Sequence, residues 1–199
     1  MGAASAQQVP PPAPAPAPAA QPAAPPDLAA LAEFAKKNFG ASFTVTPVQP
    51  RGIVAQKRAL PPIVVLTADL DADGVEDVVI VAQCAKPLID AVQLGYKVAD
   101  PYDAYFGFGD PRITQGFNAQ DPEGQQVLLI VHGWRLPQPK AKFVIINLPF
   151  DSLAVGQVAL KKNKVRASIV ATESGLMEAT IYWDGKKYRY EPGTADTGE

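Results

Sequence analysis

The sequence predicts an α+β protein that is mostly β, with an N-terminal helix packed on a largely antiparallel sheet of about eight strands. Three observations predict this fold. One stretch with helical periodicity comes first, from Asp27 to Gly40. About eight apolar or alternating segments follow it, separated by turn residues. Helices do not alternate regularly with these segments, which argues against a doubly wound α/β sheet.

Residues 1–26 carry no charge and contain nine of the 21 prolines. Such a segment cannot bury enough apolar surface to offset its chain entropy, so we expect a disordered Pro/Ala-rich spacer with a preference for polyproline II. The triplet Ala4-Ser5-Ala6 has the small-x-small form of a signal-peptidase site. It indicates either the remnant of a signal peptide in an exported protein or chance in an alanine-rich segment.

The stretch DLAALAEFAKKNFG predicts the helix. Its apolar residues recur at helical spacing, beginning with Leu28 and Leu31. Asp27 can cap the N-terminus, and Gly40 is placed to end the helix. From this helix onward we expect a single globular domain over residues 27–193, followed by a flexible tail at 194–199.

The remaining segments read as strands because they are apolar runs or alternate between apolar and polar residues. Asp184-Gly185 lies between two alternating aromatic segments and indicates a hairpin with a two-residue turn. Residues 84–126 are rich in Gly, Pro, Asp and aromatic residues, so a long loop or a pair of irregular strands is expected there. The predicted strand segments are 42–47, 61–70, 76–84, 125–134, 141–150, 153–162, 166–174 and 178–192.

A run of acidic residues separates two of the apolar segments. Counted from Asp69, aspartates stand at positions 1, 3, 5 and 9, and Gly74 stands at position 6. Hard cations such as Ca²⁺ take six to eight oxygen ligands, and a glycine permits the sharp turn that would aim the next carbonyl at the ion. The alternative is a hairpin turn with solvated acids and no ion. The strict spacing favours a structural Ca²⁺ site, because repelling carboxylates need a neutralising charge. Its predicted ligands are Asp69, Asp71, Asp73, the Val75 carbonyl and Asp77.

The spacing D-x-D-x-D-G-x-x-D between two strands resembles the calcium loops of FG-GAP and VCBS-type β repeats. This resemblance implies the same ligand set, with Asp77 binding directly or through a water. The acidic loop is not an EF-hand, because Ile80 stands at the position where an EF-hand requires a bidentate glutamate. The loop occurs once, whereas propellers of that kind repeat it. With the closing YWDGKKYRYEPG segment, residues 60–193 are similar to uncharacterised exported bacterial β-rich proteins, which implies a compartment and no activity.

A second candidate site is an aromatic and acidic segment at residues 100–117. Aromatic side chains on a loop can stack on sugar rings or bind a peptide, or they can simply cover a sheet edge. The candidate ligand-binding residues are Tyr102, Tyr105, Phe106 and Phe108. An open alternative is a hydrolase that acts on a glycan or peptide through this segment, but no nucleophile–base pair supports it and no catalytic residue is assigned.

The composition bears on partners and location. The formal net charge of −2 offers nucleic acid no general attraction. The sequence contains no apolar run long enough to span a membrane. Cys84, the single cysteine, is expected to be buried and inert, and His132, the single histidine, to be an ordinary strand residue. We therefore expect a non-enzymatic periplasmic or secreted domain with a structural calcium loop, which binds an unknown protein or cell-surface component.

Overall fold

The computed structural model describes residues 27–49, 62–107, 125–160, 164–173 and 177–193. The predicted spacer 1–26, the predicted tail 194–199 and the candidate residue Phe108 lie outside this part of the chain. The helices are α1 (Leu28–Phe39), α3 (Ala91–Leu94) and α4 (Pro101–Tyr105). The strands are β1 (Thr44–Val45), β2 (Val65–Ala68), β3 (Asp77–Cys84), β4 (Lys97–Ala99), β5 (Gln125–His132), β6 (Ala141–Ile145), β7 (Ser152–Leu160), β8 (Lys164–Glu173), β9 (Met177–Trp183) and β10 (Tyr188–Pro192).

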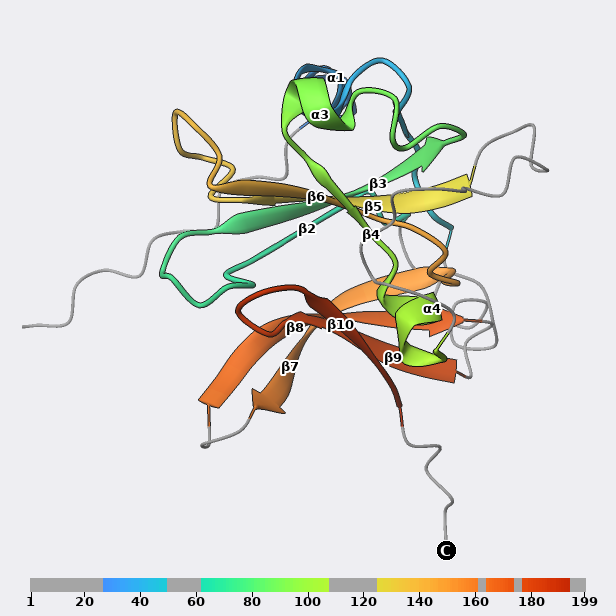
Figure 1. The fold of residues 1–199 in the computed structure, drawn as a ribbon, viewed down its shortest axis with the longest axis vertical. Helices are drawn as coiled ribbons and strands as arrows, with labels where there is room; N and C mark the ends of the chain where they lie inside the picture. The colour runs from blue at the N-terminus through green and yellow to red at the C-terminus, as the bar shows by residue number, and fades with distance from the viewer. Residues whose placement is uncertain (1–26, 50–61, 108–124, 161–163, 174–176, 194–199) are drawn as a thin grey trace, which may run out of the picture.

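The structure is mostly β, as predicted, but its strands form two sheets rather than one of about eight strands. A six-stranded sheet has the order β1-β3-β5-β6-β4, with β2 also paired to β3. A four-stranded sheet has the order β10-β9-β8-β7. Figure 1 shows the two sheets stacked face to face, with α1 and α3 on the outer face of the larger sheet.

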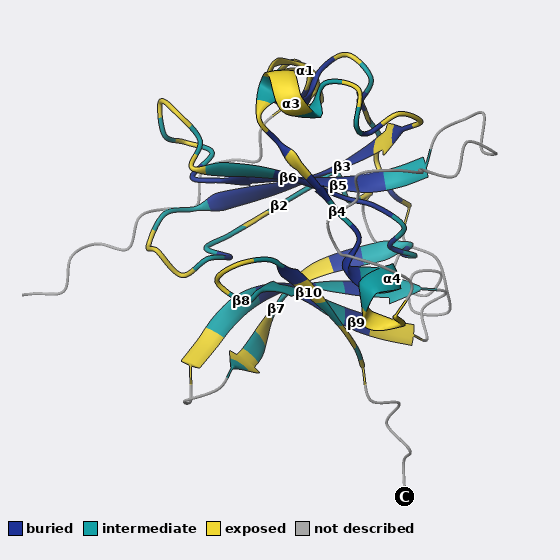
Figure 2. Ribbon diagram, in the orientation of Figure 1, coloured by how far each residue is buried: buried dark blue, intermediate teal, exposed yellow. Residues whose placement is uncertain are grey.

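The stacking of the two sheets explains why some strands have continuous apolar sequences, whereas in others the buried positions alternate with less buried ones. In β3, Val78 and Ile80 face the helices, whereas Val79 and Val81 face the second sheet. Both faces of the larger sheet are therefore covered, and its central strands are the darkest in Figure 2. The smaller sheet packs one face against the larger sheet, so in β9 the buried Ala179 and Ile181 lie on either side of the half-buried Thr180.

The helix α1 ends as predicted, since the Gly40 N–H donates to the Lys36 carbonyl 2.9 Å away. Gly40 has φ +102°, in the left-handed region that glycine adopts without strain. Asp27 stands at the N-cap position, but its side chain makes no capping hydrogen bond, contrary to expectation. Phe39 is fully buried and packs against Phe43 and Tyr96, which anchors the helix to the sheet.

Two predictions about turns and loops need correction. The hairpin around Asp184-Gly185 exists, but Trp183 pairs with Tyr188, so its loop has four residues rather than two. The Asp184 carboxylate accepts from the backbone N–H groups of Lys186 and Lys187 and stabilises this longer loop. The described part of segment 84–126 holds two short helices, α3 and α4, and the short strand β4, rather than a long loop or a pair of irregular strands. Among the described strands, β4 pairs parallel to β6 and all other pairs are antiparallel.

None of the helices in the described ranges is long and apolar enough to cross a membrane.

Candidate functional site

The acidic loop connects β2 to β3, two antiparallel strands whose last pair is Ala68 with Asp77. The loop turns sharply at two residues in the left-handed region, Ala72 with φ +60° and Gly74 with φ +84°. A Cβ atom added at Gly74 would meet nothing within 4 Å, so it is the backbone conformation that favours glycine there. The predicted position of the loop between two paired strands is confirmed, but only β3 is a core strand, because β2 has no buried residue.

The aspartates of the loop fold it around their own carboxylates. The Asp69 carboxylate accepts from the N–H of Asp73 at 3.0 Å and from the N–H of Gly74 at 2.9 Å. The Asp73 carboxylate accepts from the N–H of Val75 at 2.8 Å. Because each side chain bonds to backbone a few residues ahead, these contacts depend on local sequence alone. They turn the carboxylates toward the inside of the loop.

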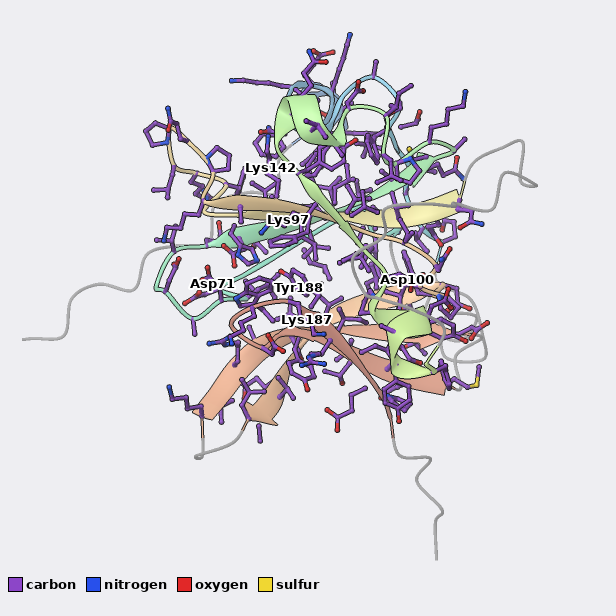
Figure 3. All side chains as sticks on the ribbon, in the orientation of Figure 1. Asp71, Lys97, Asp100, Lys142, Lys187 and Tyr188 are labelled. Atoms are coloured by element: carbon purple, nitrogen blue, oxygen red, sulfur yellow. The ribbon has the colours of Figure 1, made fainter. Side chains whose placement is uncertain are left out.

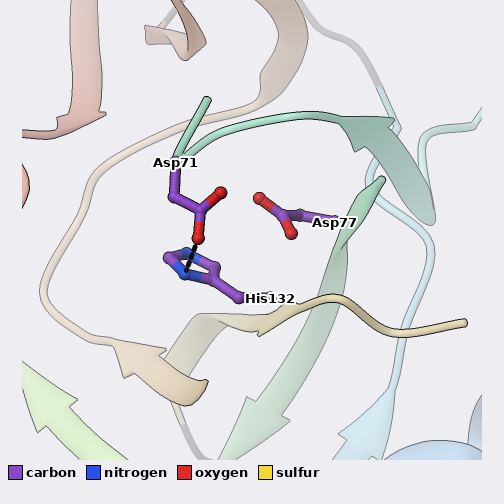
Figure 4. Close-up of side chains that lie close together, drawn as sticks. All are labelled: Asp71, Asp77 and His132. Carbon is purple, nitrogen blue, oxygen red and sulfur yellow. Dashed lines mark ion pairs between the residues drawn. The ribbon is translucent and has the colours of Figure 1, made fainter. Parts of the chain in front are cut away.

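Several of the predicted ligands converge. One oxygen each from Asp69, Asp71 and Asp73 can be chosen so that all lie within 4.8 Å of one another. A second group of the same compactness joins Asp71 and Asp77 to His132. Figure 4 shows these three side chains pointing toward a common point from the loop, the start of β3 and the end of β5. Asp71 therefore belongs to both groups.

Asp77 is fully buried and already bonded to backbone. One oxygen accepts from the N–H of Leu70 and the other from the N–H of Gly133, both at 2.8 Å. Burial raises the pKa of the Asp77 carboxyl, although these two N–H groups and nearby His132 oppose the rise. Asp77 thus ties the acidic loop to the turn after β5, a role independent of any ion.

His132 was not expected to contribute to the site, yet it lies at its centre. It is only 2% exposed, and its Nδ1 lies 3.3 Å from an Asp71 oxygen. Its Nε2 lies 2.7 Å from the hydroxyl of Tyr188, which belongs to the second sheet. An ionised carboxylate can only accept, so this arrangement favours a proton on Nδ1, with Nε2 accepting from the tyrosine. Figure 3 places Asp71 and Tyr188 between the two sheets.

The structure also supplies cations that the spacing could not reveal. The ammonium group of Lys140 contacts the Asp73 carboxylate, and this hydrogen bond is the main cause that lowers the pKa of Asp73. Burial and the neighbouring Asp77 charge raise the pKa of Asp71, against the effect of His132. The premise that only a bound ion could relieve the repulsion is therefore wrong in part, because Lys140 neutralises one of the four aspartates.

Glu76, the acidic residue between two of the predicted ligand positions, is half-buried and bonded to two side chains. Its carboxylate accepts from Arg135 Nε at 2.7 Å and from Trp134 Nε1 at 3.2 Å. These two contacts join the acidic loop to the turn between β5 and β6, which also carries the buried Gly133. For Val75, the structure shows a half-buried residue within the loop, and its carbonyl ligand role stays a prediction.

The predicted aromatic residues gather on the surface of the smaller sheet. Tyr102, Tyr105 and Phe106 come from α4 and its end, and each packs against Tyr190 of β10, with ring centroids 5.1, 5.5 and 6.2 Å away respectively. We call these four residues the aromatic patch. Tyr105 and Phe106 are 52% and 50% exposed. A pocket of ≈ 270 Å³ opens beside Tyr105 and is also lined by Lys187 and Arg189.

Asp100 precedes the patch as the N-cap of α4. It is 1% exposed, accepts from the Asp103 N–H at 2.9 Å and lies against the amide of Asn147. Burial raises the pKa of Asp100 to about 6, and the adjacent Asp103 carboxylate adds to the effect. A carboxyl group with this pKa could serve acid–base chemistry, but its burial removes it from any substrate on the patch. Figure 3 shows it beside α4, away from Asp71.

Comparisons with protein-family models, with curated proteins and with solved structures found no match for this chain. The site is therefore interpreted from its own geometry.

Proposed function

We propose that this chain is a non-enzymatic periplasmic or secreted domain with a structural Ca²⁺ site in the loop Asp69–Asp77, and that it binds a protein or cell-surface component through the aromatic patch. The observation that carries the proposal is the convergence of the Asp69, Asp71 and Asp73 carboxylates within 4.8 Å. The resemblance of the spacing to FG-GAP and VCBS-type loops supports the same ligand set.

The chemistry of the donors favours calcium. Carboxylate and carbonyl oxygens suit hard cations, and Ca²⁺ tolerates the irregular geometry of a short loop better than Mg²⁺ does. Asp69 and Asp73 each use lone pairs for backbone N–H groups, but a carboxylate has about four acceptor positions and so keeps some for an ion. His132 holds Asp71 in place through Nδ1.

A structural role fits the position of the loop better than a catalytic one. The loop joins β2 to the central strand β3, and Asp77 is enclosed by backbone donors. An ion held there would link the two strands and add its binding free energy to the stability of the fold. Extracellular calcium modules commonly bind with dissociation constants of about 0.1–1 mM, which suits an exported protein.

Thermal unfolding tests the metal site. At a free Ca²⁺ concentration ten times the dissociation constant, binding to the native state alone contributes about 1.4 kcal/mol. For a chain of this size the melting temperature should rise by roughly 3–6 °C relative to a sample in chelator. The double variant Asp71→Ala, Asp73→Ala should show no rise. Identical melting of the native chain in calcium and in chelator would contradict the proposal.

Lys140 offers a sharper test, because its ammonium group competes with an ion for Asp73. In Lys140→Gln the competing charge is gone, so calcium should raise the melting temperature more than it does in the native chain. Lys36→Gln, which removes an equal charge from the exposed face of α1, is the matched control and should respond like the native chain. If calcium raises the melting temperature of neither chain and Lys140→Gln lowers it in both media, Lys140 itself is the counterion and the loop needs no metal.

The aromatic patch supports the binding part of the proposal. Tyrosine and phenylalanine present large rigid surfaces, and the neighbouring hydroxyl, lysine and arginine groups supply hydrogen bonds. Co-sedimentation with insoluble peptidoglycan measures binding to one surface component. We expect Tyr105→Ser, Phe106→Ser to lose most of the bound fraction, and Val92→Ser, which changes a 98% exposed residue on α3, to keep it. Equal binding by both variants, or none by the native chain, would argue against a glycan partner on this patch.

A further inference from the structure

The outer strands of the two sheets differ in how well they resist pairing with another chain. An unpaired strand edge presents free N–H and C=O groups, and proteins protect such edges by shortness, charge, proline or a covering segment. In the larger sheet, β1, β2 and β4 have two, four and three residues. In the smaller sheet, β10 carries Arg189, Glu191 and Pro192, and α4 packs beside it.

The opposite edge of the smaller sheet, as far as the structure describes it, lacks shortness, charge and proline, although β2 of the larger sheet lies in contact with β7. Strand β7 runs for nine residues, SLAVGQVAL, without a charged residue or a proline. Within the described ranges its only strand partner is β8. In an antiparallel pair, every second residue directs its backbone N–H and C=O away from the partner. Among the residues that the structure places, nothing pairs with the outer edge of β7, which presents a long row of backbone groups.

Exposed apolar side chains accompany this edge. Val155 is 46% exposed and pairs with Ile169 of β8, which is buried between the sheets. Val165 is 61% exposed and pairs with Ala159, which lies on the same face of β7 as Val155. Val155 and Val165 therefore continue the inner face of the smaller sheet, and both remain exposed at this end of the sheet.

We propose that β7 of one chain pairs antiparallel with β7 of a second copy across a two-fold axis, which joins two four-stranded sheets into one of eight strands. A two-fold interface brings identical surfaces together, and an uncharged strand can meet its own copy without like-charge repulsion. A charged edge such as β10 could not do so as readily. The pairing would satisfy the open backbone groups and cover Val155 in both copies. It does not depend on the calcium site.

The area of the proposed interface determines how strongly the two copies are expected to associate. Nine residues at roughly 3.4 Å each give an edge about 30 Å long, and a sheet is about 10 Å thick, so the contact covers roughly 300 Å² per copy. Stable interfaces cover about 800 Å² per partner. The dimer is thus a weak one whose population depends on protein concentration.

Light scattering after size exclusion tests the proposal on the full chain. The average mass should rise from 21.1 kDa at low concentration toward about twice that value as the concentration increases about a hundredfold. Val155→Lys places two like charges across the two-fold axis and should keep the mass at the monomer value. Ala154→Lys, at an exposed neighbouring position, should do the same and serves if Val155→Lys fails to fold.

Val165→Lys is the matched control. It replaces an exposed valine by the same charge on the same face, but on β8, one strand away from the edge. It should dimerise like the native chain. A mass that stays at 21.1 kDa at every concentration, or a dimer disrupted equally by Val155→Lys and Val165→Lys, would overturn edge pairing. Hydrogen exchange should slow with concentration in β7 and not in β10, and the reverse pattern would also overturn it.

Discussion

Replacing Asp77 by alanine is expected to lower the free energy of unfolding by about 2–6 kcal/mol, measured by urea denaturation in chelator at neutral pH. The carboxylate is fully buried and accepts from the N–H groups of Leu70 and Gly133. Alanine would leave both donors buried without a partner, and each such group costs roughly 1–3 kcal/mol. The loss should persist without calcium, because it arises from the backbone contacts.

Two variants control this result. Asp77→Asn keeps the size of the side chain and one acceptor oxygen, so about half of the loss is expected. Asp69→Ala removes a carboxylate that also accepts two N–H bonds, but those bonds are exposed to water, which can replace them. An Asp77→Ala variant that is no less stable in chelator than Asp69→Ala would contradict the assigned role.

Replacing Asp100 by asparagine is expected to change the pH dependence of stability. Burial raises the pKa of Asp100 from 3.8 to about 6, so the folded chain holds this proton more tightly than the unfolded chain does. The stability that this protonation contributes is fully present below about pH 4 and is lost as the pH rises through about 6. The difference amounts to at most about 3 kcal/mol.

Asparagine is neutral throughout and can still accept from the Asp103 N–H. Asp100→Asn should therefore gain stability relative to the native chain between about pH 4 and pH 6 and keep that gain above it. Urea denaturation at several pH values measures the difference between the two curves. Asp103→Asn, which removes the neighbouring charge, should shift this window to lower pH. Parallel curves for the native chain and Asp100→Asn would show that Asp100 does not titrate in this range.

Element type was predictable where the pattern was long. The apolar runs that became β3 and β5 and the helical periodicity of α1 each predicted the right element. The division into two sheets was not predictable, because an apolar run shows only that both faces of a strand are covered. What covers them, helices on one side and a second sheet on the other, depends on packing between distant segments. The short β4 pairs with β6, some 45 residues away, so its parallel pairing had no local signal.

The candidate site was likewise predictable only where its contacts are local in the sequence. The alternating aspartates and Gly74 determined a turn with inward carboxylates, because those hydrogen bonds span only two to five residues. The aromatic residues Tyr102, Tyr105 and Phe106 were likewise visible as a local cluster, but their common partner Tyr190 was not.

The sequence by itself determined the mostly β fold, the N-terminal helix and a compact acidic loop between two strands. The tertiary structure alone decided what surrounds that loop. Gly133 donates to Asp77 from 56 residues away, Lys140 reaches Asp73 from 67 residues away, and His132 links the loop to Tyr188. Local spacing can orient a carboxylate through nearby backbone, but its counterions and its burial come from segments that only the packing of the sheets brings together.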